Sequence, residues 1–171
     1  MTEIHNSNLN TWSELDCNKL KIWFEKIKAR QRAHHCASYW NNIINRLLTY
    51  TSFLISAIIS TISLNITNSP SWLLPALSIT ITFIIITNGF FDFGRQSESH
   101  KNTEYGFIIL KQKIEESLIE KNNPKIKFSY FIDETSKNFN QLVKDSTRLP
   151  LYATNLLNDV KLLEAPDPFD T

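Results

Sequence analysis

The sequence is poor in glycine, in cysteine and in excess charge, and each shortage excludes a class of protein. Three glycines in 171 residues leave no G-x-G-x-x-G or P-loop pattern in which backbone amides hold a phosphate. Cys17 and Cys36 form neither a CxxC pair nor a disulfide framework. The 18 basic and 17 acidic side chains give a net charge of +1, so we expect no nucleic-acid partner.

Charge is also absent from one long window of the chain. The 45 residues 47–91 contain no Asp, Glu, Lys, Arg or His. Two apolar runs of 20 residues each, 47–66 and 72–91, lie in this window and are separated by a short polar turn. A helix of 20 residues is about 30 Å long, which matches the hydrocarbon thickness of a bilayer. The pattern predicts two membrane-spanning helices that form a hairpin.

A soluble alternative has to be weighed for these two runs. Both are rich in Ile and Thr, which favour strands, so a buried β-hairpin gives a similar pattern. Strands of 20 residues are far longer than usual, and this favours the transmembrane helical hairpin over residues 47–91.

The residues that flank the runs predict the orientation of the hairpin. The 20 residues before Leu47 contain no acid and four basic side chains, which are Lys28, Arg30, Arg32 and Arg46. Basic residues also follow the second run, whereas the connecting turn is uncharged. Lys and Arg are enriched on the cytoplasmic side, so both termini are expected there. No signal peptide is expected, because the first apolar run begins only at Leu47.

Three residues are the predicted anchors at the membrane interfaces. Trp40 and Arg46 lie near the cytoplasmic end of the first run, and Trp72 lies at the far end of the second. Tryptophan and arginine are typical of the layer where lipid headgroups meet water.

The segments outside the window predict helical arms. Residues 1–46 form an amphipathic arm that begins at a capping box from Thr11 to Glu14. Since neither Pro nor Gly occurs between Thr11 and Pro70, this arm is expected to continue unbroken into the first run as one helix of about 50 residues. Residues 92–123 form a second arm whose apolar face packs antiparallel against the first, and Gly89 and Gly94 are expected to kink the chain before it.

The C-terminal part predicts further helices. Residues 124–164 form a helical segment that Pro150 divides, and residues 165–171 form a disordered tail. The expected fold class is therefore an all-α membrane protein: a two-helix transmembrane hairpin with long cytoplasmic helical arms and a C-terminal helical segment.

The sequence contains no pattern that indicates catalysis, a cofactor or a metal site. Consecutive histidines at positions 34 and 35 point about 100° apart on a helix and are poorly placed to share one ion. His35 and His100 lie at similar distances from the two apolar runs, on different arms, and form a candidate juxtamembrane polar pair. No residue arrangement suits acid–base or nucleophilic chemistry, so an enzyme is not expected.

Hydroxyl side chains within the uncharged window are the most informative polar feature. They form a stripe at i, i+4, i+8 and i+11 in the first run and a looser stripe in the second, comprising Ser52, Ser56, Ser60, Ser63, Thr80 and Thr87. Small side chains let membrane helices approach closely, and helix packing is the first interpretation. The second is that an oligomer aligns these hydroxyls around a water-filled path.

The layout resembles the SLATT domain, a two-transmembrane effector domain associated with SMODS and SLOG proteins. The similarity covers about Trp23 to Leu118, and the residues that carry it are Arg32-Ala33-His34-His35 with Tyr39, Arg46-Leu47-Leu48, and His100 with Tyr105. The resemblance implies a homo-oligomeric membrane effector that forms a pore in response to a nucleotide signal, with Ser52, Ser56 and Ser60 on the pore face. It does not extend beyond Phe128 and includes no fused sensor domain, so a partner would have to supply any nucleotide regulation.

A structural role is the alternative. The 21 isoleucines and 17 asparagines outnumber the 7 alanines, which is typical of AT-rich genomes such as those of some bacteria and large DNA viruses. A short two-span protein of this kind also suits a structural anchor that ties a scaffold, such as a viral capsid, to a virion membrane. The partners expected under either hypothesis are the lipid bilayer, further copies of the chain and a cytoplasmic protein bound through the helical arms.

Overall fold

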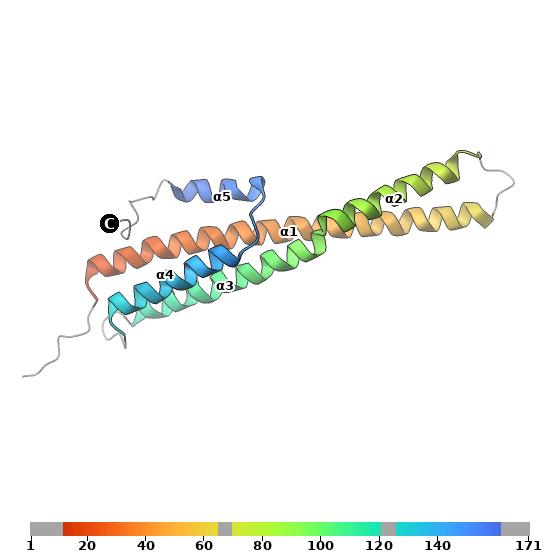
Figure 1. Ribbon diagram of the computed structural model, residues 1–171. Coiled ribbons are helices and arrows are strands. Elements are labelled where there is room, and N and C mark those ends of the chain that lie inside the picture. The colour runs from red at the N-terminus through yellow and green to blue at the C-terminus, as the bar shows by residue number, and fades with distance from the viewer. Residues whose placement is uncertain (1–11, 65–69, 121–125, 162–171) are drawn as a thin grey trace, which may run out of the picture. The chain divides into compact units, whose positions relative to one another are not determined.

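The computed structural model describes residues 12–64, 70–120 and 126–161, and every regular element in these ranges is an α-helix. The helices are α1 (Glu14–Leu64), α2 (Leu73–Phe91), α3 (Phe93–Ile119), α4 (Phe128–Asp145) and α5 (Leu151–Lys161), as Figure 1 shows. The all-α prediction is confirmed for the described residues. The alternative of a β-hairpin is wrong, because both apolar runs are helical there.

Helix α1 is continuous over 51 residues, as the absence of Gly and Pro predicts. Its N-cap residue is Ser13, two residues later than the expected Thr11. The backbone N–H of Asp16 donates to Ser13 Oγ at 3.2 Å, and the backbone N–H of Ser13 donates to Asp16 Oδ2 at 3.1 Å. The capping box is therefore formed by Ser13 and Asp16, whereas Thr11 lies outside the described residues.

The chain divides into two compact units. The terminal unit comprises residues 1–37 and 100–171, and the hairpin unit comprises Ser38–Ser99. Both α1 and α3 contribute residues to each unit. The hairpin unit thus begins before Leu47 and ends after Phe91, because parts of the predicted arms belong to it.

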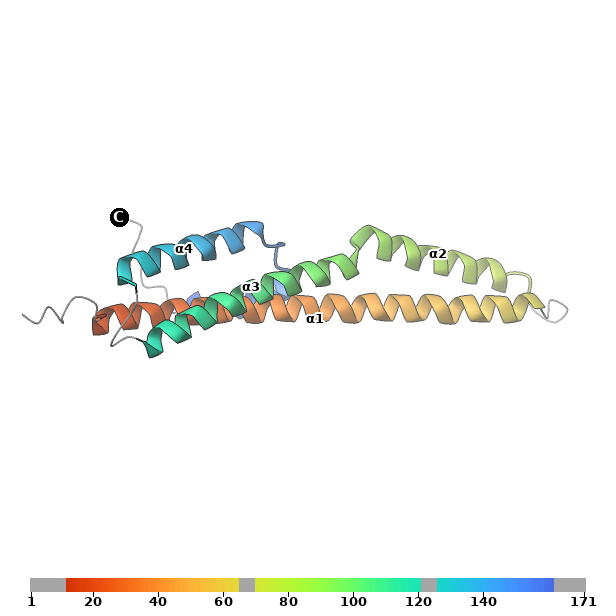
Figure 2. The same cartoon turned by 90° about the horizontal axis from the view of Figure 1, so that it is seen from below.

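The core of the terminal unit lies between α1, α3 and α4. Figures 1 and 2 show α3 running antiparallel to this part of α1, as the apolar periodicity predicts. The ring of Trp23 on α1 meets Phe139 on α4 edge-on, with 5.2 Å between ring centroids. The buried core side chains recur at three- and four-residue intervals on α1 and α3 and are adjacent on α4; they are Leu20, Trp23, Ile27, Phe107, Leu110, Ile114, Phe131 and Ile132.

Helix α5 completes the described part of the terminal unit. It starts directly after Pro150, whose carbonyl accepts the backbone N–H groups of Ala153 and Thr154. Pro150 therefore separates α4 from α5, as predicted. Ala153 is fully buried, and Figure 1 shows α5 on the opposite side of α1 from α3. The expected disordered tail, residues 165–171, lies outside the described residues.

Within the hairpin unit, α1 and α2 contact each other through aliphatic side chains. The half-buried aliphatic positions recur at intervals of seven, four and three residues on α1 and of four and three residues on α2. These side chains are mainly Leu48, Ile55, Ile59 and Ile62 on α1, with Leu77, Ile81 and Ile84 on α2. Helix α2 has no fully buried residue, because only one of its faces is covered.

The break between α2 and α3 falls on an aspartate. Asp92 has a φ of 44° in the left-handed region, whereas neither Gly89 nor Gly94 has a positive φ. The predicted kink is therefore present, but the two glycines do not make it. Gly94 has a different role: a Cβ at this position would lie 3.4 Å from Asn45 Nδ2, so α3 begins close against α1.

Small polar side chains hold that close approach inside the hairpin unit. Ser38 Oγ donates to the carbonyl of Ser97 at 2.9 Å, and Ser97 Oγ donates back to the carbonyl of Ser38 at 2.9 Å. Side chains of this size let helix backbones approach closely while satisfying their own polar groups.

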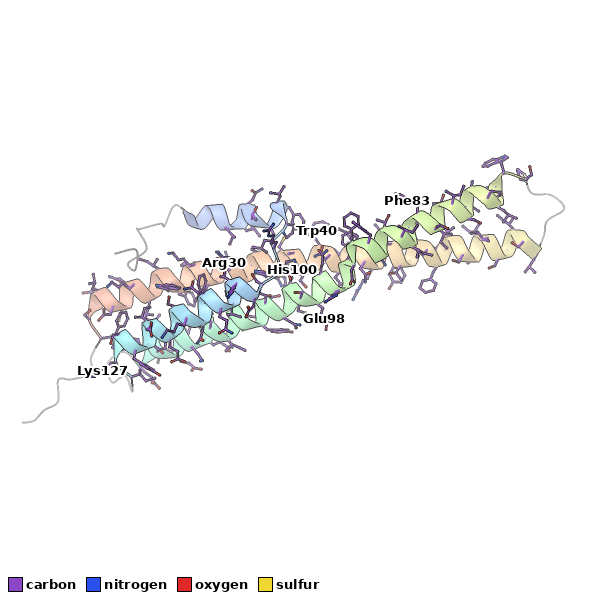
Figure 3. All side chains as sticks on the ribbon, viewed as in Figure 1. Arg30, Trp40, Phe83, Glu98, His100 and Lys127 are labelled. Carbon is purple, nitrogen blue, oxygen red and sulfur yellow. The ribbon has the colours of Figure 1, made fainter. Side chains whose placement is uncertain are left out.

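Two helical stretches, Glu14–Leu64 and Leu73–Ile119, are long and apolar enough to cross a membrane by length and composition. None of the residues in their most apolar windows is buried. The large side chains left uncovered include Phe53, Ile79, Phe83 and Phe90, and Phe83 is labelled in Figure 3.

Candidate functional site

The predicted hydroxyl stripe lies mostly on the outer surface of the hairpin unit. Ser56, Ser60 and Ser63 are exposed, and only Ser52 is half-buried beside the contact with α2. On α2, Thr80 is exposed and Thr87 is half-buried. Within the described hairpin the half-buried side chains between the two helices are mainly Leu and Ile, so the exposed hydroxyls remain available for packing against another helix or for a water-filled path.

Each hydroxyl with a described partner bonds back to its own helix. Ser60 Oγ donates to the carbonyl of Ser56 at 2.9 Å, and Ser63 Oγ donates to the carbonyl of Ile59 at 2.8 Å. Ser52 and Thr80 donate in the same way to Leu48 and Ala76. These bonds satisfy the hydroxyl hydrogen within the helix, so the stripe tolerates an apolar neighbour and still offers oxygen lone pairs to water.

The three predicted interface anchors are all exposed in the hairpin unit. Trp72 follows Pro70 and Ser71 just before α2, while Trp40 and Arg46 lie on α1. The carboxylate of Asp92 accepts the backbone N–H of Arg95 at 3.3 Å. Among the described residues, it forms no ion pair with Arg46.

The histidine that faces His100 is His34. The predicted pair of His35 with His100 is therefore wrong. The Nδ1 atoms of His34 and His100 are 3.1 Å apart, and both side chains are almost completely buried. His35 is exposed and lies with its Nδ1 3.0 Å from Glu104 Oε1. Adjacent helical residues point in different directions, so only one of the two histidines can face α3.

The sequence contained a signal for the correct histidine. Leu20 and Ile27 are fully buried on α1, and position 34 follows them at the same seven-residue interval. Distance along each helix places His35 and His100 at similar heights, but the side of α1 that carries the core residues selects His34.

Burial keeps the histidine pair uncharged. The pKa of His34 is lowered to about 4 by burial, and then by the nearby His100 and Arg30. Burial also lowers the pKa of His100. With both rings neutral, the Nδ1–H of one imidazole donates to the bare Nδ1 of the other. The ring of Phe107 lies against His34 with 5.7 Å between ring centroids.

The pair alone does not build a metal site. Among the described residues, no group of three or more His, Cys, Asp or Glu side chains is placed to hold an ion. His34 retains one unusual feature: its buried Nε2 has no hydrogen-bond partner in the described chain.

Comparison with family models, with curated protein sequences and with solved structures finds no match for this chain. The function is therefore argued from the geometry of the two units and from the sequence resemblance.

Proposed function

We propose that the chain is an integral membrane protein whose hairpin unit spans the bilayer twice, with both termini on the cytoplasmic side. We further propose that copies associate through the outward serine stripe to enclose a water-filled path. The support for membrane insertion is the exposure of large apolar side chains on both helices within the uncharged window, residues 47–91. In water this surface would be costly, whereas in lipid it is solvated.

The observation that carries the pore is the position of Ser56, Ser60 and Ser63. They lie on successive turns of α1, on the outside of the hairpin, inside a window without any charged residue. A hydroxyl stripe on the outer face of one hairpin can form hydrogen bonds with a second hairpin or with water. Repetition of that face around an oligomer would place the serines along a central path.

The resemblance to SLATT domains agrees with this proposal, since those proteins are membrane effectors that form pores. The signal that opens the path would come from a partner bound to the helical arms.

A dye-release assay tests the pore directly. Purified protein is reconstituted into liposomes that contain a self-quenched dye, and release is followed for the unaltered chain and for Ser56→Leu and Ser60→Leu. The matched control is Thr61→Leu: Thr61 is also exposed and donates back to Ala57, but it lies on the opposite side of α1 from the stripe. We expect release by the unaltered protein and by the control, and severalfold slower release by the two serine variants.

Two results would contradict the pore. The first is equal release by all four proteins, which would mean that the serine stripe does not line the path. The second is no release from liposomes in which insertion has been verified. That second result favours the structural alternative, in which the exposed Tyr105 and Ile109 of α3 bind a scaffold protein.

The membrane topology has its own test. Epitope tags at the two ends are probed in intact and in permeabilised cells that express the full chain. Both tags should be protected until the membrane is opened, and a tag that is accessible from outside at one end alone would overturn the two-span arrangement.

A further inference from the structure

The terminal unit contains a pocket that neither the pore nor the membrane proposal uses. It has a volume of about 320 Å³ and lies between α1, the connection from α4 to α5, and α5. In Figure 3, the labels of Arg30 and His100 mark the region where this connection passes α1. A volume of this size is at the lower end of the range for sites that bind small molecules.

The charges around the pocket are all of one sign. Arg30 from α1 and Arg148 from the α4–α5 connection line it, and none of the lining residues whose side chains the structure describes is acidic. Among the described residues, neither guanidinium forms an ion pair with a carboxylate. Arg30 is half-buried, burial lowers its pKa, and its guanidinium lies 5.6 Å from the centre of the Phe139 ring. Two arginines that line one pocket, with no ion pair among the described residues, favour the binding of an anion there.

The third observation is the orphaned nitrogen of His34. His34 lines the same pocket and is fully buried, and its Nε2 has no partner in the described chain. When His34 Nδ1 accepts the proton of His100 Nδ1, the neutral ring carries its own proton on Nε2. A buried N–H donor without an acceptor is costly, so this tautomer is stabilised by an acceptor that comes within hydrogen-bond distance of Nε2.

Two hydroxyl groups in the pocket wall donate their protons to backbone carbonyls of the protein and not to a ligand. Ser146 Oγ donates to the carbonyl of Val143 at 2.8 Å, and Thr154 Oγ1 donates to the carbonyl of Leu151 at 2.7 Å. The charged donors among the described lining residues are the two arginines, and His34 adds an imidazole nitrogen. Such a set suits a ligand group with several acceptor oxygens and negative charge, and the guanidinium fork matches phosphate in particular.

We propose that this pocket binds a phosphate group, held by Arg30 and Arg148 and oriented by the Nε2–H of His34. The phosphate belongs either to a small soluble molecule or to a lipid headgroup, and both present the same oxygens to the pocket. The proposal is independent of the pore, because all of its residues lie in the terminal unit.

The test measures the thermal unfolding of the full chain in a neutral detergent. Inorganic phosphate is titrated at constant ionic strength, with chloride as the replaced anion, and unfolding is followed by tryptophan fluorescence. Because a ligand that binds the folded state raises the midpoint, the titration gives an apparent affinity. We compare the unaltered chain with Arg148→Gln and Arg30→Gln. The matched control is Arg32→Gln, which removes the same charge from an exposed position of α1 outside the pocket.

We expect phosphate to raise the midpoint of the unaltered chain and of Arg32→Gln equally. Each pocket variant should weaken the apparent affinity about tenfold or more, since each loses a charge-assisted hydrogen bond to the anion. Arg148 is exposed, so its replacement is expected to leave the fold intact. If Arg30→Gln loses structure, as its circular dichroism spectrum would show, Arg148→Gln alone carries the comparison.

A second series of measurements, in which the micelles contain phosphatidic acid, distinguishes a lipid headgroup from a soluble phosphate. Protection by the lipid that both pocket variants lose identifies a headgroup, whereas protection by inorganic phosphate alone identifies a soluble ligand. The proposal is overturned if neither additive protects the unaltered chain. It is also overturned if the pocket variants respond like the unaltered chain, or if Arg32→Gln weakens binding as much as Arg148→Gln does.

Discussion

His34 and His100 face each other between α1 and α3 with their Nδ1 atoms 3.1 Å apart, in the buried interior of the terminal unit. The contact joins residues that are 66 positions apart in the chain and connects the two predicted arms. Both imidazoles are neutral in the folded protein, because burial opposes their protonation. This neutral pair makes the stability of the terminal unit depend on pH.

Stability should fall as the solution is acidified from neutral pH. In the unfolded chain a histidine takes up a proton near pH 6.5, whereas folded His34 does so only near pH 4. The contribution of neutral His34 to the free energy of unfolding is fully present above pH 6.5. It is lost as the pH falls from 6.5 to 4, because the unfolded state binds more protons than the folded state in that range. A shift of this size corresponds to about 3 kcal/mol at pH 4. Thermal unfolding of the full chain between pH 7 and 4 measures it.

The contribution of His34 is isolated by two variants. Other groups also titrate below pH 5, so the informative quantity is the difference between the unaltered chain and His34→Gln, which should lose most of the dependence between pH 6.5 and 5. The control is Arg32→Gln, an exposed residue on the same helix whose replacement keeps both buried histidines and should therefore keep the pH dependence. Identical profiles for the unaltered chain and His34→Gln would show that the buried pair does not control this range.

Phe107 should be the most sensitive position of the terminal core. Its side chain is fully buried, and its ring lies 5.7 Å from that of His34 and 5.9 Å from that of Phe139, centroid to centroid. Phe107→Ala leaves a cavity between α1, α3 and α4 and should lower the free energy of unfolding by about 3–5 kcal/mol. Tyr105→Ala, two residues earlier and exposed, should change it by less than about 0.5 kcal/mol. Denaturant unfolding monitored by tryptophan fluorescence compares them, and equal losses would argue against this core.

Gly106 should tolerate a methyl group only when Leu142 is shortened. A Cβ on Gly106 would lie 2.5 Å from Leu142 Cδ2, so the leucine has to move. Alanine gains about 1 kcal/mol of helix propensity over glycine, and the crowding opposes this gain. We therefore expect Gly106→Ala to stabilise the Leu142→Ala background by about 1 kcal/mol more than it stabilises the unaltered chain. A double-mutant cycle measures this coupling, and additive effects would show that the two residues do not touch.

Asp92 should accept only residues that adopt the left-handed conformation. Its φ is 44°, and its carboxylate accepts the backbone N–H of Arg95 in the first turn of α3. Asp92→Asn should be nearly neutral, because asparagine visits this region and keeps a side-chain acceptor. Asp92→Ile should lower stability by about 1–2 kcal/mol, since a β-branched residue is strained there. Thermal unfolding in detergent distinguishes the two, and a harmless isoleucine would contradict the observed break.

Local structure was largely predictable from the sequence because it depends on short-range features. The absence of Gly and Pro before Pro70 leaves nothing to interrupt α1, and Pro150 cannot continue α4. The uncharged window and the three- to four-residue spacing of apolar side chains likewise indicate where apolar helices form and which arms pack. These features act within one turn or one helix, so they can be seen without knowing the partners.

The tertiary structure alone decided which side chains meet. Which of His34 and His35 faces His100 depends on the rotation of α1 against α3, and a step of one residue changes that direction by about 100°. The outward position of Ser56 depends likewise on which face of α1 meets α2. Arg30 and Arg148 are more than a hundred residues apart and line one pocket only because α5 folds back along α1. Composition and periodicity carry no information about such rotations and returns, since these are set by how complementary faces pack.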